Sequence, residues 1–442
     1  MSGNLTIRNA ELVLPDRVVT GDLVVEDGVI TEIGPHVERS VGEVIYASGL
    51  TLLPGVIDPQ VHFRDPGLTR KEDLISGSRA AAAGGITAFL DMPNTVPNTD
   101  SVAALHNKLA HAEGRSVVHY GFFIGANGDN IDELNAAERT CGIQVYMGAS
   151  KDNLLVDDPE QLEYIFAHAN KLIAVHAESE SRLRERKMMY PDADDPAQHP
   201  VIRDVEAAMI ATKQATAFAL KYGRRLHMLH LTSAEEADYL ATLPRDLITA
   251  EVCPQHLFLH AETAYERLGT RAQCNPPVRG RRHAEALKKR LLDGTINCIA
   301  TDHAPHTIEE KQRPYPNAPS GLPGVEWSLP LMLNQVNQDW CTLSQVAKWM
   351  CEGPASCYRI PRKGRLEVGF DGDLVLVDMK KTKTIGEDKI LSRSKWSPYE
   401  GWQVTGWPVL TAILGQPVFR DGQIIDGVHG RELTYRRMRD AT

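Results

Sequence analysis

The chain reads Gly55-Val-Ile-Asp-Pro-Gln60-Val-His62-Phe-Arg64-Asp-Pro-Gly67, an apolar run that enters a Gln-x-His-x-Arg pattern and stops at Pro-Gly. Side chains alternate across a strand, so Gln60, His62 and Arg64 share one face. An imidazole beside a guanidinium suits a metal ion next to an anionic substrate. The stretch therefore predicts a strand whose end begins a metal or substrate site.

Short apolar runs alternate with helical patterns through the middle of the chain. The runs cover residues 52–57, 87–92, 117–124, 143–147, 172–175, 225–231, 248–252 and 295–300. Seven of the eight are followed by a clear helical segment, such as 70–83 or 204–222. This order predicts an α/β fold, a (β/α)8 barrel of the TIM type. A doubly wound open sheet is the alternative, but no G-x-G-x-x-G follows an early strand.

Both ends of the chain show a different sequence pattern, in which apolar and polar residues alternate between short turns. Residues 21–28, 372–378 and 417–425 show it clearly. Such alternation is typical of antiparallel strands with one buried face. We predict one small β-sandwich domain from residues 1–54 and 365–442, with the barrel, residues 55–364, inserted between them. Two unrelated β caps are the alternative.

The composition is that of an ordinary globular protein, with 42% hydrophobic and 24% charged residues. The 442 residues exceed what one core usually covers, in agreement with a large and a small domain. A formal charge of -10 argues against a nucleic-acid-binding surface. The seven cysteines form no C-x-x-C pair, and no apolar run reaches about 18 residues. We therefore expect a cytoplasmic protein that binds neither nucleic acid nor membrane.

Histidines and an aspartate follow four of the predicted strands. They are His62, His176, His230 and Asp302. In a barrel, residues just past the strand ends converge on one face. Neutral imidazoles with one carboxylate are the usual ligands of a catalytic Zn²⁺, and the aspartate can also take a proton from its bound water. The four residues predict a zinc site.

Longer motifs extend this pattern over nearly the whole chain. They are Asp58-Pro-Gln-Val-His-Phe-Arg-Asp-Pro-Gly, Met92-Pro-Asn-Thr, Val175-His-Ala-Glu, Glu251-Val-Cys-Pro-Gln-His-Leu, Thr301-Asp-His-Ala-Pro-His and Gly321-Leu-Pro-Gly-Val-Glu. In order and spacing they resemble the motifs of dihydroorotases, which belong to the amidohydrolase superfamily. The resemblance implies a metal-dependent hydrolase of pyrimidine biosynthesis that interconverts N-carbamoyl-L-aspartate and L-dihydroorotate. It also implies a barrel with a β domain built from both chain ends.

The resemblance assigns roles to individual residues. It makes His62, His176 and His230 metal ligands, and Asp302 both a ligand and the catalytic proton shuttle. The residues implied to bind substrate are Arg64, Asn94, His306, Gly321 and, more weakly, Asn275. A guanidinium binds a carboxylate through a bidentate fork, so Arg64 fits a carboxylate substrate. Hydantoinases and allantoinases lack an arginine there, because their substrates carry no matching carboxylate.

Two glutamines interrupt the family pattern. The family has a histidine at the position of Gln60, and often a carboxylated lysine that bridges two metals at the position of Gln144. Lys151 is a weak substitute, since it falls in the loop expected after the strand. Without the bridging anion, the repulsion between two dications makes a second metal improbable. The remaining ligands suffice for one ion, so we predict one Zn²⁺ per chain, or none.

Three functions follow. The first is a dihydroorotase with a reduced, one-metal site. The second is a catalytically silent homologue that acts as a structural partner of aspartate carbamoyltransferase, and the third is another cyclic amidohydrolase. A homo-oligomer is expected, but its size is open, and the loop 308–323 is either a lid over the substrate or an ordinary surface loop.

Several charged residues are interpreted as surface residues. Five histidines in or near helical patterns belong to this set: His111, His119, His168, His260 and His283. The run Arg279-Gly-Arg-Arg is interpreted as a solvated approach to a helix.

Overall fold

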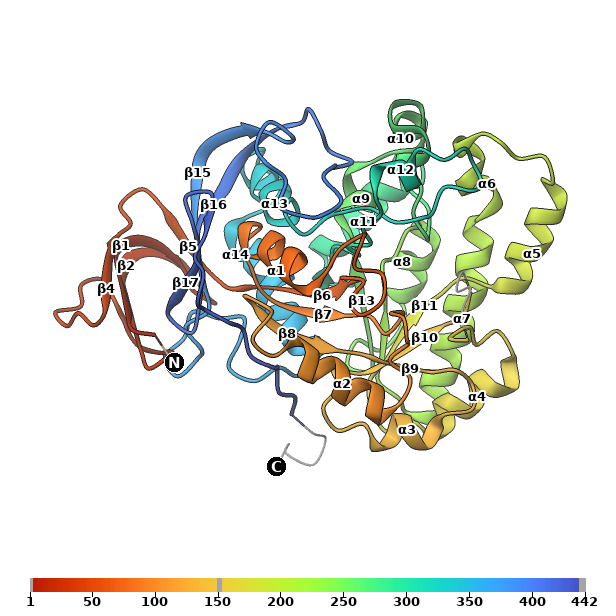
Figure 1. Cartoon of the computed structure of the whole chain (residues 1–442), viewed down its shortest axis with the longest axis horizontal. Helices are drawn as coiled ribbons and strands as arrows, with labels where there is room; N and C mark the ends of the chain where they lie inside the picture. Colours follow the sequence, from red (N-terminus) through yellow and green to blue (C-terminus); the bar gives the residue numbers. More distant parts are fainter. Residues whose placement is uncertain (1–2, 149–152, 437–442) are drawn as a thin grey trace.

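Parallel strands line the centre of the computed structural model, which describes residues 3–148 and 153–436 (Figure 1). They form two sheets, ordered β6-β7-β8 and β14-β13-β12-β11-β10-β9. The strands are β6 (Val56–Val61), β7 (Ile86–Asp91), β8 (His119–Phe122), β9 (Ile124–Gly125), β10 (Ile143–Tyr146), β11 (Ile173–His176), β12 (Leu226–Met228), β13 (Ile248–Val252) and β14 (Cys298–Ile299).

The two sheets close into one barrel. The backbone N–H of His62 donates to the carbonyl oxygen of His303 at 2.8 Å, which joins β6 to the segment after β14. At the other junction, the N–H of Phe123 donates to the carbonyl of Asp91 at 3.1 Å. Phe123 alone separates β8 from β9, so these two make one barrel strand. The predicted (β/α)8 barrel is confirmed, and the doubly wound sheet is not formed.

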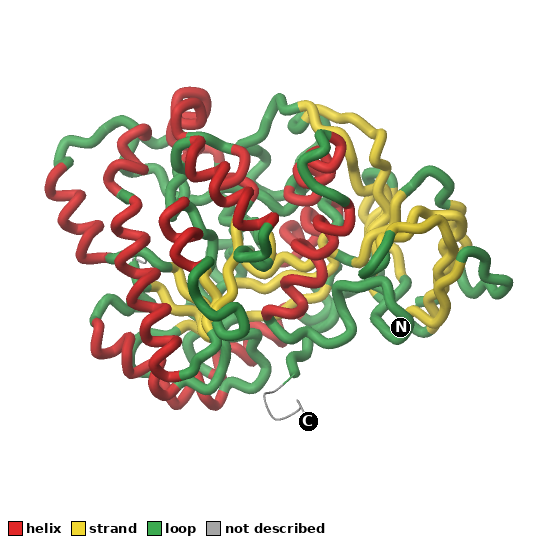
Figure 2. Tube along the Cα trace, turned by 180° about the vertical axis from the view of Figure 1, so that it is seen from behind, coloured by secondary structure: helices red, strands yellow, loops and turns green. Residues whose placement is uncertain are grey.

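Helices surround the strands in both views (Figures 1 and 2). They are α1 (Leu74–Ala83), α2 (Val102–Ala112), α3 (Ile131–Ala136), α4 (Pro159–His168), α5 (Glu180–Met189), α6 (His199–Ile202), α7 (Val205–Tyr222), α8 (Ala234–Leu240), α9 (Pro254–Phe258), α10 (Ala261–Leu268), α11 (Arg281–Leu292), α12 (Ile308–Lys311), α13 (Ser328–Asn337), α14 (Leu343–Ala347) and α15 (Gly353–Cys357). Two 3-10 turns, η1 (Pro196–Gln198) and η2 (Gly269–Ala272), and one π-helical turn, η3 (Lys348–Glu352), lie in the same part of the chain. Several helices begin at Ser or Asp caps, such as Ser233 before α8.

Side chains along each barrel strand point alternately toward the surrounding helices and toward the barrel interior, so the barrel has two separate cores. Ile143 and Val145 of β10 belong to the same buried cluster as Leu162 of α4. Gln144, between them, lies on the other face of the strand and is buried as well. Every second residue of a barrel strand therefore faces the barrel interior, which is where polar side chains can meet.

Both chain ends join a separate sheet at one side of the molecule (Figure 1). Its order is β18-β17-β16-β15-β5-β1-β2-β3, with β4 beside β1. Its strands are β1 (Leu5–Val13), β2 (Val18–Glu26), β3 (Val29–Gly34), β4 (Glu43–Tyr46), β5 (Thr51–Pro54), β15 (Leu374–Thr384), β16 (Gln403–Ile413), β17 (Gln416–Arg420) and β18 (Gln423–Ile424). β5 pairs with β1 on one side and with β15 on the other. One β domain, with its own apolar core, therefore replaces the alternative of two unrelated caps.

The first apolar run divides between the two parts of the fold. Residues 51–54 belong to β5 of the mixed sheet, whereas Val56–Val61 forms β6 of the barrel. Gly55 makes the crossing, and a Cβ there would lie 2.2 Å from Thr87 Oγ1 and 2.9 Å from Asp373 Cβ. Only glycine allows the chain to pass this close. The sequence pattern showed one run because apolar periodicity does not reveal which sheet a strand joins. The domain boundaries at residues 54 and 364 stay predictions.

Segments from the C-terminal part of the chain close one end of the barrel. Tyr358 and Ile360, just after α15, pack in one cluster with the interior residues Ile57 and Leu90. Leu433 joins the same cluster, and its N–H donates to the carbonyl of Tyr120 at 2.8 Å. The last described residues thus return from the β domain to the barrel.

Three residues expected at the surface are buried. Arg279 is 6% exposed, and its Nε donates to Thr232 Oγ1 at 2.9 Å. His119 lies in β8 and His283 in α11, both buried. The prediction that these three residues lie at the surface is wrong. Charge and helical periodicity do not show which polar side chain in a segment has a hydrogen-bond partner inside the protein.

Two further expectations concern membranes and thiols. No helix in the described ranges is both long enough and apolar enough to cross a membrane. All seven cysteines are buried free thiols.

Candidate metal and substrate site

The backbone is irregular where the predicted site residues leave their strands. Arg64, His230 and Asp302 adopt positive φ angles of 61°, 34° and 48°. This region of backbone space is unfavourable for residues with a Cβ and costs of order 1 kcal/mol or more for each residue. A fold retains such conformations where surrounding contacts hold them, commonly at functional sites. Three of the predicted site residues share this feature.

His62 and Asp302 form the first close pair of donors. His62 Nε2 lies 3.1 Å from Asp302 Oδ1, and His62 Nδ1 lies 2.8 Å from Asn94 Oδ1. An amide oxygen only accepts, so Nδ1 carries the hydrogen and the lone pair of a neutral His62 faces the carboxylate. Two acceptors that face each other need a proton or a cation between them.

His176 and His230 form the second pair, with His176 Nδ1 3.0 Å from His230 Nε2. His176 Nε2 donates to Glu178 Oε2 at 2.8 Å, and Arg203 Nε donates to Glu178 Oε1 at 3.0 Å. A carboxylate behind a histidine fixes its tautomer and orients the other nitrogen, as it does for metal-ligating histidines. Burial and the neighbouring His176 lower the pKa of His230 to about 3, so His230 is neutral and able to ligate a metal.

A buried carboxylate supports the segment that leads to Asp302. Thr301 Oγ1 donates to Asp58 Oδ2 at 2.6 Å, and Thr301 N donates to Asp58 Oδ1 at 3.0 Å. Burial raises the pKa of Asp58 to about 7 despite these hydrogen bonds. Asp58, within β6, thereby holds the segment after β14, and His62 and Asp302 follow these two strands.

The two glutamines lie among these donors. Gln60 Nε2 donates to Asp302 Oδ1 at 3.3 Å, and Gln144 Nε2 donates to the carbonyl of Val145 at 3.4 Å. Both amide oxygens, and His230 Nδ1, are buried without a hydrogen-bond partner among residues 3–148 and 153–436. Lys151 lies outside the described residues. Buried acceptors without donors, beside neutral imidazoles and a carboxylate, fit a cation.

The four predicted ligands come together as two pairs rather than as one tight group. In the described part of the chain, the one group of three His, Cys, Asp or Glu donors within 4.8 Å of each other is His227, Glu251 and Cys298. This group is distinct from the strand-end residues. Glu251 begins one of the motifs quoted above, but no motif indicated His227 or Cys298 as a possible ligand.

A cationic pocket adjoins the His62–Asp302 pair. Arg64 is 8% exposed, and no carboxylate oxygen of the described residues lies within 4.0 Å of its guanidinium. Arg64 Nη2 lies 3.3 Å from His306 Nε2, and Arg64 Nε donates to the carbonyl of Pro305 at 3.4 Å. Burial lowers the pKa of Arg64 and that of His306, the latter to about 3. The pocket thus holds a buried guanidinium that lacks a close counter-ion within the described part of the chain.

Lys71 is a site residue that the sequence analysis missed. Its Nζ donates to His306 Nδ1 at 2.9 Å and lies 3.5 Å from Glu310 Oε2. Because Nδ1 accepts from the ammonium, the hydrogen of a neutral His306 sits on Nε2, which donates to the carbonyl of Ser320 at 3.0 Å. Lys71 precedes α1, and a lysine at a helix approach usually faces water, so nothing in the sequence distinguished it.

The other two predicted substrate residues, Asn275 and Gly321, make different contacts. Asn275 Oδ1 accepts from His199 Nε2 at 3.0 Å, which leaves the amide nitrogen of Asn275 available. Gly321 has a φ of 140°, and a Cβ there would lie 2.4 Å from the carbonyl oxygen of Ala304 and 3.1 Å from His306 Cδ2. Only glycine fits beside His306. His199 was a second residue missed by the motifs.

The loop 308–323 is anchored rather than loose. Lys311, at the end of α12, is fully buried, and its Nζ donates to the carbonyls of Gln273 and Pro319 at 2.8 and 2.9 Å. Burial lowers the pKa of Lys311 to about 7. Whether the loop acts as a lid stays a prediction.

Comparison with known proteins identifies the family. Residues 51–418 match the model of the amidohydrolase family. The chain is 34% identical to the dihydroorotase of Methanothermobacter thermautotrophicus over 434 residues, 96% of each chain. It is 35% identical to that of Halobacterium salinarum over 433 residues, 94% of this chain and 99% of the relative.

Comparison of three-dimensional structures supports the same family. The L-hydantoinase (dihydropyrimidinase) of Arthrobacter aurescens superposes with a TM-score of 0.93 at 29% identity, covering 98% of this chain and 100% of the other. The dihydropyrimidinase of Brevibacillus agri superposes with a TM-score of 0.90 at 27% identity, with the same coverage. The first is named a hydantoinase and both are named dihydropyrimidinases. The chain therefore belongs to the amidohydrolase family, as a metal-dependent cyclic amidohydrolase similar to dihydroorotases.

Proposed function

We propose that this protein is a working dihydroorotase, which interconverts N-carbamoyl-L-aspartate and L-dihydroorotate with one Zn²⁺ at the strand ends. The observation that carries the proposal is Arg64, a buried guanidinium without a close counter-ion among residues 3–148 and 153–436. A buried charge without a partner costs several kcal/mol, and a substrate carboxylate would offset that cost. Both substrates named above carry such a carboxylate. The pathway would be de novo pyrimidine synthesis, in the cytoplasm.

Each part of the site has a task in this reaction. His62, His176, His230 and Asp302 would hold the zinc ion, which supplies Lewis-acid chemistry when bound. Asp302 would take a proton from the attacking water and deliver it to the leaving ring nitrogen. Arg64, Asn94 and His306 would hold the carboxylate. Asn275 and the backbone of Gly321 would contact the ring. Side chains of this protein would thus both bind the substrate carboxylate and transfer the proton.

A second candidate is another cyclic amidohydrolase, favoured by the hydantoinase and dihydropyrimidinase structures. The substrate of such an enzyme need not carry a carboxylate, and Arg64 would then have no ligand. The third candidate, a silent structural partner of aspartate carbamoyltransferase, is supported by the loss of two ligands at Gln60 and Gln144. Neither candidate explains why a charged pocket is kept beside Asp302.

The test is a ring-opening assay of the purified chain on L-dihydroorotate, with and without added Zn²⁺. We expect zinc-dependent turnover in both directions of the reaction. Elemental analysis then compares the zinc content of the wild type with that of His230→Ala, which lacks one predicted ligand. A lower content in the variant shows that the metal is held at the strand ends.

Absence of turnover under all these conditions would contradict the proposal. In that case Gln60→His combined with Gln144→Lys shows whether the rest of the site is competent. Turnover in that variant alone, together with co-migration of the wild-type chain with aspartate carbamoyltransferase in gel filtration, would favour the silent partner. The elution volume of the chain alone, on the same gel-filtration column, reports its oligomeric state.

A further inference from the structure

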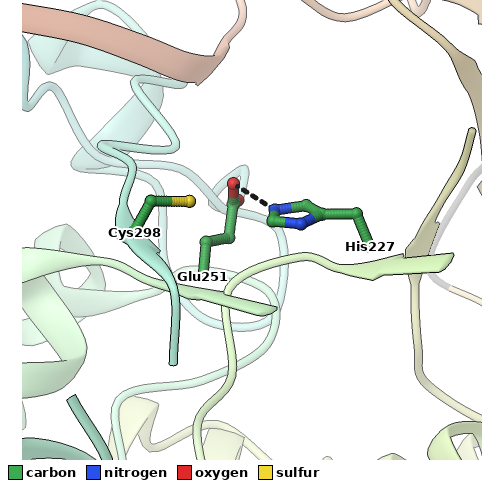
Figure 3. A group of neighbouring side chains, drawn as sticks. All are labelled: His227, Glu251 and Cys298. Carbon is green, nitrogen blue, oxygen red and sulfur yellow. Dashed lines mark hydrogen bonds and ion pairs between the residues drawn. The ribbon is translucent and has the colours of Figure 1, made fainter. Parts of the chain in front are cut away.

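A second set of metal-ligand side chains lies inside the barrel, on the strands themselves (Figure 3). His227 belongs to β12, Glu251 to β13 and Cys298 to β14, and one donor atom of each lies within 4.8 Å of the other two. The strand register produces this proximity, because Glu251 pairs with Cys298 and His227 pairs with Thr249. The site needs no irregular backbone. We call these three residues the barrel triad.

The imidazole of His227 is already oriented for ligation. Its Nδ1 lies 2.8 Å from Thr249 Oγ1, and that hydroxyl donates to the carbonyl of Leu226 at 3.3 Å. The hydroxyl hydrogen is thus engaged, so Nδ1 carries a hydrogen and donates to Oγ1. Nε2 then faces Glu251 Oε2 at 3.0 Å. Fixing one ring nitrogen by a hydrogen bond is how proteins present the other nitrogen to a metal.

The carboxylate of Glu251 lacks part of its hydrogen bonding. Glu251 is 0% exposed, and its Oε1 has no hydrogen-bond partner within the described ranges. Burial raises the pKa of this carboxyl group. A buried carboxylate oxygen without a donor costs about 1–3 kcal/mol or more. A donor or a cation at Oε1 would offset this cost.

Two thiols complete the surroundings. Figure 3 shows the sulfur of Cys298 directed toward the Glu251 carboxylate. Cys357, at the end of α15, lies against both His227 and Cys298. Both cysteines are buried. Sulfur, imidazole and carboxylate donors therefore converge from three strands and one helix.

We propose that the barrel triad is a structural site for a transition-metal dication, best suited to Zn²⁺, with Cys357 available as a fourth ligand. The thiolate of Cys298 and the carboxylate of Glu251 neutralise a dication, and the imidazole adds no charge, so the three-residue site gains no net charge, whereas ligation by a Cys357 thiolate would add one negative charge. Thiolate ligands disfavour Mg²⁺ and Ca²⁺. Binding would release the thiol proton of Cys298, that of Cys357 where it ligates, and any proton on His227 Nε2 to solvent.

This ion would be separate from the one at the strand ends. With both ions bound the chain would hold two, one more than the single Zn²⁺ per chain expected from the sequence, because that expectation counted only His62, His176, His230 and Asp302, which offer nitrogen and oxygen. The barrel triad adds sulfur, so the two ions differ in their spectroscopic properties. Its role would be to join β12, β13 and β14 from inside.

The alternative is a plain ion pair, in which a protonated His227 donates to both Thr249 and Glu251. That arrangement leaves Glu251 Oε1 unpartnered and gives Cys298 no role. It also requires no metal. Spectroscopy on the sulfur ligand distinguishes the two, because an ion pair produces no metal–sulfur signal.

The experiment uses the full chain produced in medium enriched in Co²⁺, so that the ion enters the buried site during folding. Thiolate–Co²⁺ ligation gives charge-transfer absorption in the near ultraviolet, which nitrogen and oxygen ligands do not give. We expect this band in the wild type. X-ray absorption of the zinc-loaded chain should show sulfur at about 2.3 Å, a measurement that needs no variant.

Four variants locate the signal. The band should weaken in Cys298→Ala and vanish when Cys357→Ala is added. It should remain in Cys341→Ala, which removes another buried thiol, and in His230→Ala, which alters only the strand-end donors. Absence of both the band and the sulfur signal in the wild type overturns the proposal and leaves the ion pair. A band that survives in the double variant also overturns it.

Discussion

The strand ends and the barrel interior assemble polar donors in different ways. At the strand ends, Arg64, His230 and Asp302 need left-handed backbone to reach their places, and the donors meet as two separate pairs. In the interior, regular strand register alone brings His227, Glu251 and Cys298 within 4.8 Å. Both sets of side chains are buried, but the strand-end residues lie where the strands give way to loops, whereas His227, Glu251 and Cys298 lie within the strands. The difference suggests chemistry at the first region and stability at the second.

Asp302→Asn should break the strand-end region with the largest effect. Loss of the proton acceptor lowers kcat by about 10²–10⁴-fold. The free energy of unfolding should change little, since residues in strained functional sites contribute little to stability. Steady-state kinetics on L-dihydroorotate and urea denaturation of the same preparation measure both. A variant that keeps more than a tenth of the wild-type kcat would remove Asp302 from the proton path.

Glu251→Gln should give the opposite result in the interior. It removes the carboxylate that faces His227, and breaking a buried pair costs about 3–5 kcal/mol of unfolding free energy. The folded fraction should keep its kcat. Glu285→Gln, at an exposed ion pair on α11, is the matched control. Equal urea midpoints for the two variants would show that the interior pair does not stabilise the fold.

The two regions should also respond to pH with opposite sign in the metal-free chain. Burial, with the charges of Arg64 and Lys71, lowers the pKa of His306 to about 3. Between about 6.5 and 3 the unfolded chain therefore binds more protons, and stability falls as pH falls. Hydrogen bonds to Cys357 and Glu251 outweigh burial and raise the pKa of His227 to about 9. Between about 6.5 and 9 the folded chain holds more protons, and stability falls as pH rises.

Urea midpoints measured from acid to alkaline pH test this contrast. His306→Gln should flatten the acid side and His227→Gln the alkaline side, each by at most about 1.4 kcal/mol per pH unit. An unchanged slope in both variants would show that neither histidine is perturbed.

A smaller effect is expected from Lys71→Met. Without the ammonium, His306 loses the hydrogen bond that fixes its tautomer, and the pocket loses one positive charge. KM for L-dihydroorotate should rise about tenfold, equivalent to about 1.4 kcal/mol, while kcat changes less. Lys221→Met, at an exposed ion pair, serves as the control. A fall in kcat alone would point to a structural role instead.

Much of the fold could be read from the sequence because it depends on local patterns. Alternating runs and helices predicted the barrel, and strand-end motifs predicted His62, His176, His230 and Asp302. What could not be read depends on contacts between distant segments. Gly55 divides one apolar run between two sheets, and Lys71 approaches His306 across 235 positions of the chain. The barrel triad was missed although Glu251 begins a motif, because the register of three separate strands brings it beside His227 and Cys298.

The most direct test of the account compares Arg64→Gln with the wild type on two substrates, L-dihydroorotate and dihydrouracil, which lacks the carboxylate. The wild type should prefer L-dihydroorotate. In the variant, kcat/KM for L-dihydroorotate should fall about 10–100-fold, as expected for lost hydrogen bonds to a charged group, while that for dihydrouracil should stay the same. Arg79→Gln, at an exposed ion pair with Asp426, should alter neither. Equal losses on both substrates, or faster wild-type turnover of dihydrouracil, would contradict the claim that Arg64 selects a carboxylate substrate.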